Sequence, residues 1–438
     1  MYIGGFGRLP KPPRLPSGRL RWPTPAQVPE WVPAAGKFGD ASTNLPSAID
    51  PDPTNAAVYA GVTGFASVWE AWGGGCFASG LGSLGSLLML SGGNRSYDGN
   101  GIVRFDVATR LFSMHTSPAA YSSLEEVSGD NGTTNVNVST SGGWPNGSAF
   151  PPHTYSGVCY VPSVGGGGTS GSWVHLVHWQ NNVNITKTGL WRCDLASGAW
   201  SYKNLQDVSV YANYGGICYD STRGGVWVLA PTSQYGLQRL VFYSYSTDTW
   251  TEVTMSGTGT ESGAIMPDGL FDVCPEFVAS KNCLVLPKNG TGLTVVCIDL
   301  GATVIGSNNT ADVFNVTQSG TKCPCMWDSS GTPQSLASFR YCSQDGALYV
   351  LDQYAGASGC VLYKLAPPAG ALSGTWTWSH ETLTANAGES LALRANTSGT
   401  VGDKMLFGRM QYVPSIKSFV ISDSRTLKAQ ALRPAAFT

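Results

Sequence analysis

Short apolar runs alternate with polar and glycine-rich turns along most of the chain. From about residue 62 onward one local pattern recurs six times: an apolar or glycine-rich approach, an aromatic residue, and then a turn of small residues. The six aromatic residues, separated by 83, 59, 58, 64 and 71 residues, are Phe77, Tyr160, Tyr219, Phe277, Tyr341 and Tyr412. Self-similarity at such periods is typical of repeat architectures.

Each copy continues with a second apolar segment of strand length, and a third strand then leads into a hairpin. In three hairpins, five residues separate an Asp or Ser from an aromatic residue. The pairs are Asp106 and Phe112, Asp194 and Trp200, and Ser244 and Trp250. A longer version of this hairpin ends at Trp376. The pattern predicts four short strands per repeat, with the polar residue capping the turn and the aromatic residue filling the gap between sheets.

These hairpins, with the glycine pair Gly92-Gly93 after a second strand, resemble those of the Kelch-type β-propeller superfamily, which shares its general fold with galactose oxidase. The resemblance covers residues 62–438. It implies an all-β fold and no activity by itself. Blades are expected at about 73–120, 154–208, 212–256, 272–318, 336–383 and 405–432. The six repeated aromatic residues, together with Phe112, Trp200, Trp250 and Trp376, are the expected packing residues of the blades.

The sixth repeat ends too early to contain a fourth strand. A strand-like apolar segment at residues 65–72 has no partner in its own repeat. Pairing the two would close the ring and leave no exposed sheet edge. We therefore expect a six-bladed β-propeller that is closed by an N-terminal strand at residues 65–72.

The first 54 residues differ in composition from the rest. Eleven of the 26 prolines fall between Pro10 and Pro53, and five basic residues occur before any acidic one. Proline removes backbone donors and favours extended geometry, which predicts a basic docking arm at residues 1–54, with a disordered tail as the alternative. The expected anchors are Tyr2, Phe6, Arg8, Arg14, Arg19, Arg21, Trp22 and Trp31. Deleting the arm is expected to leave a folded propeller that no longer docks.

Composition excludes several classes of protein. With 55 Gly, 26 Pro and only 12% charged residues, the chain is neither all-α nor a coiled coil, and 42% hydrophobic residues exclude global disorder. A net charge of −2 argues against a nucleic-acid binder, and no apolar run is long enough for a membrane span. The eleven cysteines lie without clustered spacing in apolar runs. They are expected to be buried free thiols of a reducing compartment, with one or two disulfides as the alternative.

No catalytic residue, cofactor or metal ligand is assigned. His175 and His178 are three apart on a strand and point to opposite faces, so they are expected to be structural. Cys323-Pro-Cys325 with Cys342 lacks a fourth zinc ligand. The Cys-aromatic pairs at residues 76, 159 and 218 recur at one blade position, as packing residues do. None of the five His can be matched to a galactose-oxidase copper site, and no sialidase-type turn is present.

The leading expectation is a non-enzymatic structural component of a bacteriophage virion, in the tail, nozzle, baseplate or capsid attachment. It looks like the propeller-containing proteins of short phage tails. Such a part would assemble in the host bacterial cytoplasm and dock through its arm to other virion structural proteins in a symmetric multi-copy assembly. The alternative is a carbohydrate or host-surface recognition module that uses Trp144 and Trp327 in long loops. An oxidase or hydrolase is the third reading.

Overall fold

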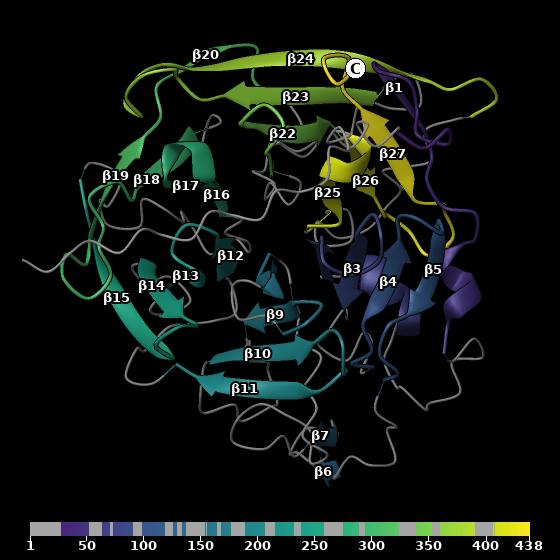
Figure 1. Cartoon of the computed structure of the whole chain (residues 1–438), viewed down its shortest axis with the longest axis horizontal. Coiled ribbons are helices and arrows are strands. Elements are labelled where there is room, and N and C mark those ends of the chain that lie inside the picture. The colour runs from purple at the N-terminus through teal and green to yellow at the C-terminus, as the bar shows by residue number, and fades with distance from the viewer. Residues whose placement is uncertain are drawn as a thin grey trace, which may run out of the picture.

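The computed structural model is almost entirely β-structure, and its strands surround a common centre (Figure 1). Alternating apolar and polar residues bounded by glycine-rich turns favour strands throughout, so the prediction of an all-β propeller is confirmed. The structure describes residues 28–51, 64–70, 73–90, 99–118, 126–128, 134–136, 154, 156–163, 168–176, 189–205, 215–231, 238–257, 275–288, 294–323, 339–352, 360–389, 406 and 408–438.

The described strands fall into six four-stranded units, which we call blades 1 to 6. Blade 1 contains β2 (Gly74–Ala78), β3 (Ser86–Leu90), β4 (Val103–Asp106) and β5 (Leu111–Met114). Blade 2 contains β8 (Val158–Val161), β9 (Ser172–Leu176), β10 (Gly189–Asp194) and β11 (Trp200–Asn204). Blade 3 contains β12 (Gly216–Asp220), β13 (Gly225–Pro231), β14 (Gln238–Ser244) and β15 (Thr249–Ser256).

The second half of the chain repeats this plan. Blade 4 contains β16 (Glu276–Val278), β17 (Cys283–Lys288), β18 (Thr294–Asp299) and β19 (Thr310–Asn315). Blade 5 contains β21 (Arg340–Cys342), β22 (Ala347–Asp352), β23 (Cys360–Ala366) and β24 (Trp376–Ala385). Blade 6 contains β25 (Met410–Val413), β26 (Ser418–Ile421), β27 (Gln430–Arg433) and β1 (Lys37–Asp40).

Neighbouring blades touch at the axis and at the rim. The first strands contact one another in the closed order β2, β8, β12, β16, β21, β25 and back to β2. At the rim, β15 pairs in parallel with β19, and β24 pairs in parallel with β1, which joins blades 3 and 4 and blades 5 and 6 into larger sheets. The interior is therefore continuous around the ring.

The strand that closes the ring is β1, and the expectation of a closing strand at residues 65–72 is wrong. β1 pairs antiparallel with β27 and parallel with β24. Residues 64–66 form the 3-10 turn η2 (Gly64–Ala66), and the next residues form the helix α1 (Ser67–Glu70). The physical reason is the apolar spacing: Phe65, Val68 and Trp69 recur at three and four residues, which is the period of a helix face.

The described part of the expected docking arm belongs to the propeller. Phe38 of β1 is buried, and the ring of Trp31 lies under the Arg110 guanidinium at 5.0 Å. Thr43 donates its backbone N–H to the Arg110 carbonyl at 2.9 Å, so this segment also covers the outer edge of blade 1. The prediction of a separate arm reaching to residue 54 is therefore wrong. The other expected anchors, Tyr2 to Trp22, lie outside the described residues.

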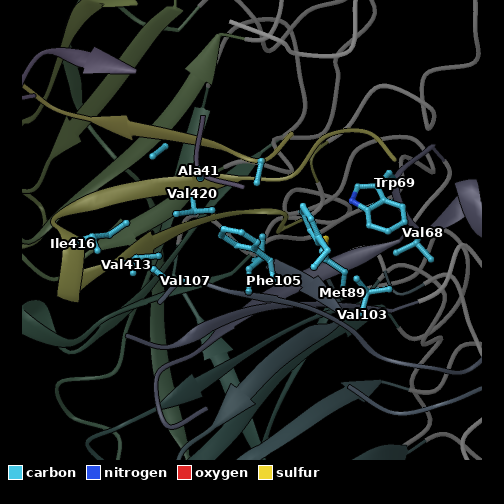
Figure 2. Packing of buried hydrophobic residues seen from close by; sticks show 14 of the residues in the cluster. Ala41, Val68, Trp69, Met89, Val103, Phe105, Val107, Val413, Ile416 and Val420 are labelled. Carbon is cyan, nitrogen blue, oxygen red and sulfur yellow. The ribbon is translucent and has the colours of Figure 1, made fainter. Parts of the chain in front are cut away.

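The N-terminal segment, blade 1 and blade 6 share one hydrophobic cluster. Figure 2 shows Trp69 and Val68 of α1 with Phe105 of blade 1, Val420 of blade 6 and Ala41, which follows β1. Trp69 is fully buried and donates its indole N–H to the Ser422 hydroxyl at 2.7 Å. The cluster thus holds together segments from both ends of the described chain.

The remaining described elements are short. The hairpin of β6 (Glu126–Ser128) and β7 (Thr134–Val136) lies within the long insertion between blades 1 and 2, and β20 (Gln318–Gly320) pairs with β24. The remaining 3-10 turns with described bounds are η1 (Pro46–Ile49), η6 (Ala279–Lys281) and η9 (Pro414–Ile416). None of the described helices has the length and hydropathy of a membrane-spanning segment.

Candidate functional site

A cleft of about 470 Å³ opens between blades 3 and 4. One wall is the β14–β15 hairpin of blade 3, and the other is the loop after β18 in blade 4. The buried ring of Phe242 and the Arg223 side chain also line it. The cores of the two blades pack together in one hydrophobic cluster, which includes Phe242.

Hydroxyl groups line the blade 3 wall. Thr249 and Thr251 are two residues apart on β15 and therefore face the same way, opposite Ser244 and Phe242 of β14 in the register. Thr249 is exposed and Thr251 is half-buried. The Thr249 hydroxyl lies 2.7 Å from that of Thr247. One of these two hydroxyls donates its proton to the other, so the pair can still donate one hydrogen bond and accept others.

The blade 4 wall is apolar at its tip. Val304 is 57% exposed, the highest value among the large hydrophobic residues that the structure describes as exposed. Its loop is closed by two backbone hydrogen bonds with Asn308, at 3.0 and 2.8 Å, and turns at Gly306 with a φ of +90°. Glycine adopts that conformation without strain. The loop therefore presents a fixed apolar surface to the hydroxyls of the opposite wall.

Arg223 fixes the two walls relative to each other. Its guanidinium donates to the Asp220 carboxylate at 2.7 Å within blade 3. It also donates to the Asn282 side chain at 2.8 Å and to the carbonyls of Leu300 and Thr303 at 2.8 and 3.3 Å in blade 4. The Asp220 side chain is fully buried and that of Arg223 is 14% exposed. The two charges neutralise each other at short range, so this side of the cleft is polar but not ionic.

This arrangement suits a neutral ligand that has both hydroxyl groups and apolar C–H surface. The serine and threonine hydroxyls both donate and accept hydrogen bonds, whereas Val304 and Ile305 offer an apolar contact. This cleft was not predicted from the sequence. Its signal is the spacing Thr247-x-Thr249-x-Thr251 at the end of a predicted hairpin, which places two hydroxyls along one side of a strand and a third in the turn before it.

The two residues expected to bind a ligand from loops, Trp144 and Trp327, lie outside the described residues. The ten expected packing residues are all placed in or against hydrophobic clusters of the blades. Trp376 is fully buried, while Trp200 and Trp250 are half-buried near the rim. These residues hold adjacent sheets together and do not line the cleft.

The histidine and cysteines considered as ligands lie in the core where the structure describes them. His175 is buried, and its Nδ1 accepts a hydrogen bond from the Trp173 indole at 2.9 Å. Cys323 and Cys342 belong to different hydrophobic clusters, while His178 and Cys325 lie outside the described residues. Burial raises the pKa of Cys76 above its ordinary value, so this thiol stays neutral near neutral pH.

No protein-family model matches the chain, and no curated protein sequence matches it. Solved structures resemble it in fold. TolB from Acinetobacter baumannii is 10% identical, with a TM-score of 0.38, over 72% of this chain and 54% of its own. A putative gluconolactonase is 10% identical, with a TM-score of 0.38, over 91% and 97%. The GH74 xyloglucanase from Xanthomonas campestris is 11% identical, with a TM-score of 0.41, over 92% and 53%.

These comparisons contradict the expectation of a non-enzymatic virion component. The solved structures that resemble the chain include proteins named as enzymes, such as the xyloglucanase, and they give no support to a virion, phage or tail role. The chain spans about half the length of the TolB and xyloglucanase chains. At these identities the likeness concerns the fold alone, so no activity or substrate passes from these proteins to this one.

Proposed function

We propose that this propeller recognises a neutral carbohydrate, and that the cleft between blades 3 and 4 is its binding site. The observation that carries the proposal is the pairing of a hydroxyl-bearing strand with an apolar loop across an open cleft. A sugar ring has hydroxyls around its edge and C–H groups on its faces, so it can satisfy both walls at once. We also propose that the propeller is of the Kelch type. This rests on the hairpins in which Asp106 and Asp194 accept backbone N–H groups of their turns.

The balance of charge at the cleft supports a neutral ligand. The buried Asp220 carboxylate already binds Arg223, and it also accepts the Trp227 indole N–H at 2.9 Å. An anionic ligand would have to compete with this carboxylate for the guanidinium, at the cost of leaving a charge unpaired in the interior. A neutral ligand can bind the hydroxyls and leave the ion pair intact.

The test is a binding measurement with Thr251→Val, which removes one hydroxyl and keeps the shape of the side chain. The full chain would first be screened against immobilised neutral glycans, and the best oligosaccharide would then be titrated by calorimetry. The variant is expected to bind about fivefold more weakly, which is the effect of losing one neutral hydrogen bond. Chromatography of the incubated oligosaccharide would report any cleavage in the same samples.

The matched control is Thr382→Val. Thr382 is an exposed threonine on β24 of blade 5 and does not line the cleft, so its replacement should leave the affinity unchanged. If Thr251→Val and Thr382→Val bind the oligosaccharide as tightly as the original chain, the cleft is not the site. If no neutral glycan binds, the proposed function is wrong.

A further inference from the structure

Three aromatic side chains gather on one face of blade 2, away from the cleft. Trp191 of β10 lies directly opposite Tyr202 of β11 and His175 of β9. Trp200 is two residues before Tyr202 on β11 and therefore lies on the same face of the sheet. The ring centres of Trp191 and Trp200 are 6.3 Å apart, and those of Trp191 and Tyr202 are 5.3 Å apart. Trp191, Trp200 and Tyr202 form a small cluster of their own, which we call the blade 2 aromatic cluster.

Trp191 brings an unsatisfied donor to this cluster. Its side chain is only 4% exposed, and within the part of the chain that the structure describes its indole N–H has no hydrogen-bond partner. Indole nitrogens in protein interiors usually find an acceptor, since a buried donor without one loses the hydrogen bond it would make to water. The indole Nε1 is a donor only, so the missing partner must be an acceptor.

The surroundings of the indole are aromatic and uncharged. The charged residues of these two strands, Arg192, Asp194 and Lys203, alternate with the cluster residues and therefore face the opposite side of the sheet. Trp200 and Tyr202 are half-buried, so parts of both rings can still be reached. Burial raises the pKa of Tyr202 above its ordinary value, which keeps the phenol neutral. A charged ligand would lose its hydration here without gaining a counter-charge.

We propose that the blade 2 aromatic cluster is a second saccharide contact, in which a sugar ring packs on Trp200 and Tyr202 and one of its oxygens accepts the Trp191 indole N–H. C–H groups on the face of a sugar ring pack on the electron-rich face of an aromatic ring, and sugar oxygens supply the missing acceptor. That the ligand is a saccharide rests on the proposed function. The location of this second site does not, because it rests on the unsatisfied Trp191 indole N–H.

The test follows the Trp191 indole signal in the full-length chain. The protein would be deuterated and labelled with ¹⁵N-tryptophan, and the Trp191 indole resonance assigned from a Trp191→Phe variant, or from Trp191→Tyr if the first does not fold. β-1,3-Galactotriose, cellotriose and maltotriose would then be titrated separately. The Trp191 indole N–H is expected to move downfield with at least one trisaccharide, and Trp200→Ala to abolish the shift. Trp191→Phe should weaken that trisaccharide about fivefold.

Trp250 provides the internal control, because its indole N–H already donates to the Asn204 carbonyl at 2.8 Å and should not move. The two sites are read separately: Thr251→Val should leave the Trp191 shift intact. If the Trp191 signal stays fixed with all three trisaccharides, a buried water is the partner of the indole and the proposal is wrong. That result would leave the cleft untouched, while a Trp191 shift together with an unchanged calorimetric affinity of the Thr251→Val variant would refute the cleft alone.

Discussion

At the scale of single residues, Arg223 connects blades 3 and 4 through hydrogen bonds that no sequence pattern indicates. Its partners Asn282 and Thr303 are 59 and 80 residues away in the sequence. Asp220 accepts the backbone N–H groups of Thr222 and Arg223 as well as the guanidinium. Arg223 therefore stabilises one side of the cleft, and its ion pair with Asp220 adds no net charge there.

Replacing Arg223 by methionine should therefore destabilise the protein strongly. The Arg223→Met variant keeps the apolar stem and leaves the fully buried Asp220 carboxylate without its counter-charge, which costs about 3–5 kcal/mol. Urea unfolding followed by tryptophan fluorescence measures this loss. Arg239→Met is the control, because its ion pair with Glu252 at 3.3 Å is partly exposed and should contribute less than about 1 kcal/mol. Equal losses in the two variants would contradict the role given to Arg223.

Residue roles could be predicted from the sequence only where a repeat marks them. The recurring aromatic positions, such as Tyr160 and Tyr412, do lie against the blade cores. Arg223 and Trp191 occur at no recurring position, and their significance comes from neighbours that only the folded chain brings together. The hydroxyls of Thr249 and Thr251 are visible as an alternation, but the apolar wall that faces them belongs to another blade.

At the scale of elements, the short strand β1 has the largest consequence. It follows a proline-rich stretch and lacks the repeat signature that identifies the other strands. It nevertheless pairs with β27 over all four residues and with β24 in parallel. The run at residues 65–72 looked more like a strand because it is more apolar, but its apolar residues have helical spacing.

Deleting residues 1–50 should open the ring, although the composition of this region suggested a dispensable arm. The deletion removes β1, the buried Phe38 and Val32, and the Trp31 contact with Arg110. Burying each large apolar side chain contributes about 1.5–3 kcal/mol, so the loss is comparable with the stability of a typical domain, about 5–15 kcal/mol.

Differential scanning calorimetry measures the effect of this deletion. A chain that begins at residue 28 retains β1 and is the matched control. The chain lacking residues 1–50 is expected to melt far below the control or to show no cooperative transition. Similar melting temperatures for the two would mean that β1 does not close the propeller.

At the scale of the whole molecule, one position of each inner strand links each blade to the next. In blades 4 to 6 the residue before the repeated aromatic is polar and hydrogen-bonds to the following inner strand. Glu276 accepts the Tyr341 N–H at 3.0 Å, Arg340 donates to the Met410 carbonyl at 3.2 Å, and Gln411 donates to the Gly75 carbonyl at 3.3 Å. In blades 1 to 3 the same position holds the buried cysteines Cys76, Cys159 and Cys218. At this position, three blades thus use a hydrogen bond and three a buried thiol.

The repeat period therefore predicts the architecture of the molecule but not its function. Periodic strands specify the blades, and equivalent positions around the axis specify how the blades touch. The cleft lies between the β14–β15 hairpin of blade 3 and the loop after β18 in blade 4, so it depends on how the two blades are placed next to each other. That placement results from the packing of two sheets, and the sequence of neither strand alone indicates it.

The central claim is that a neutral carbohydrate binds between blades 3 and 4. A crystal structure of the full chain with its best-binding neutral oligosaccharide tests this claim most directly. We expect electron density for a sugar ring with an oxygen in hydrogen-bond contact with the Thr251 hydroxyl and a C–H face on Val304. An oligosaccharide bound elsewhere on the ring, with the cleft unoccupied, would contradict it.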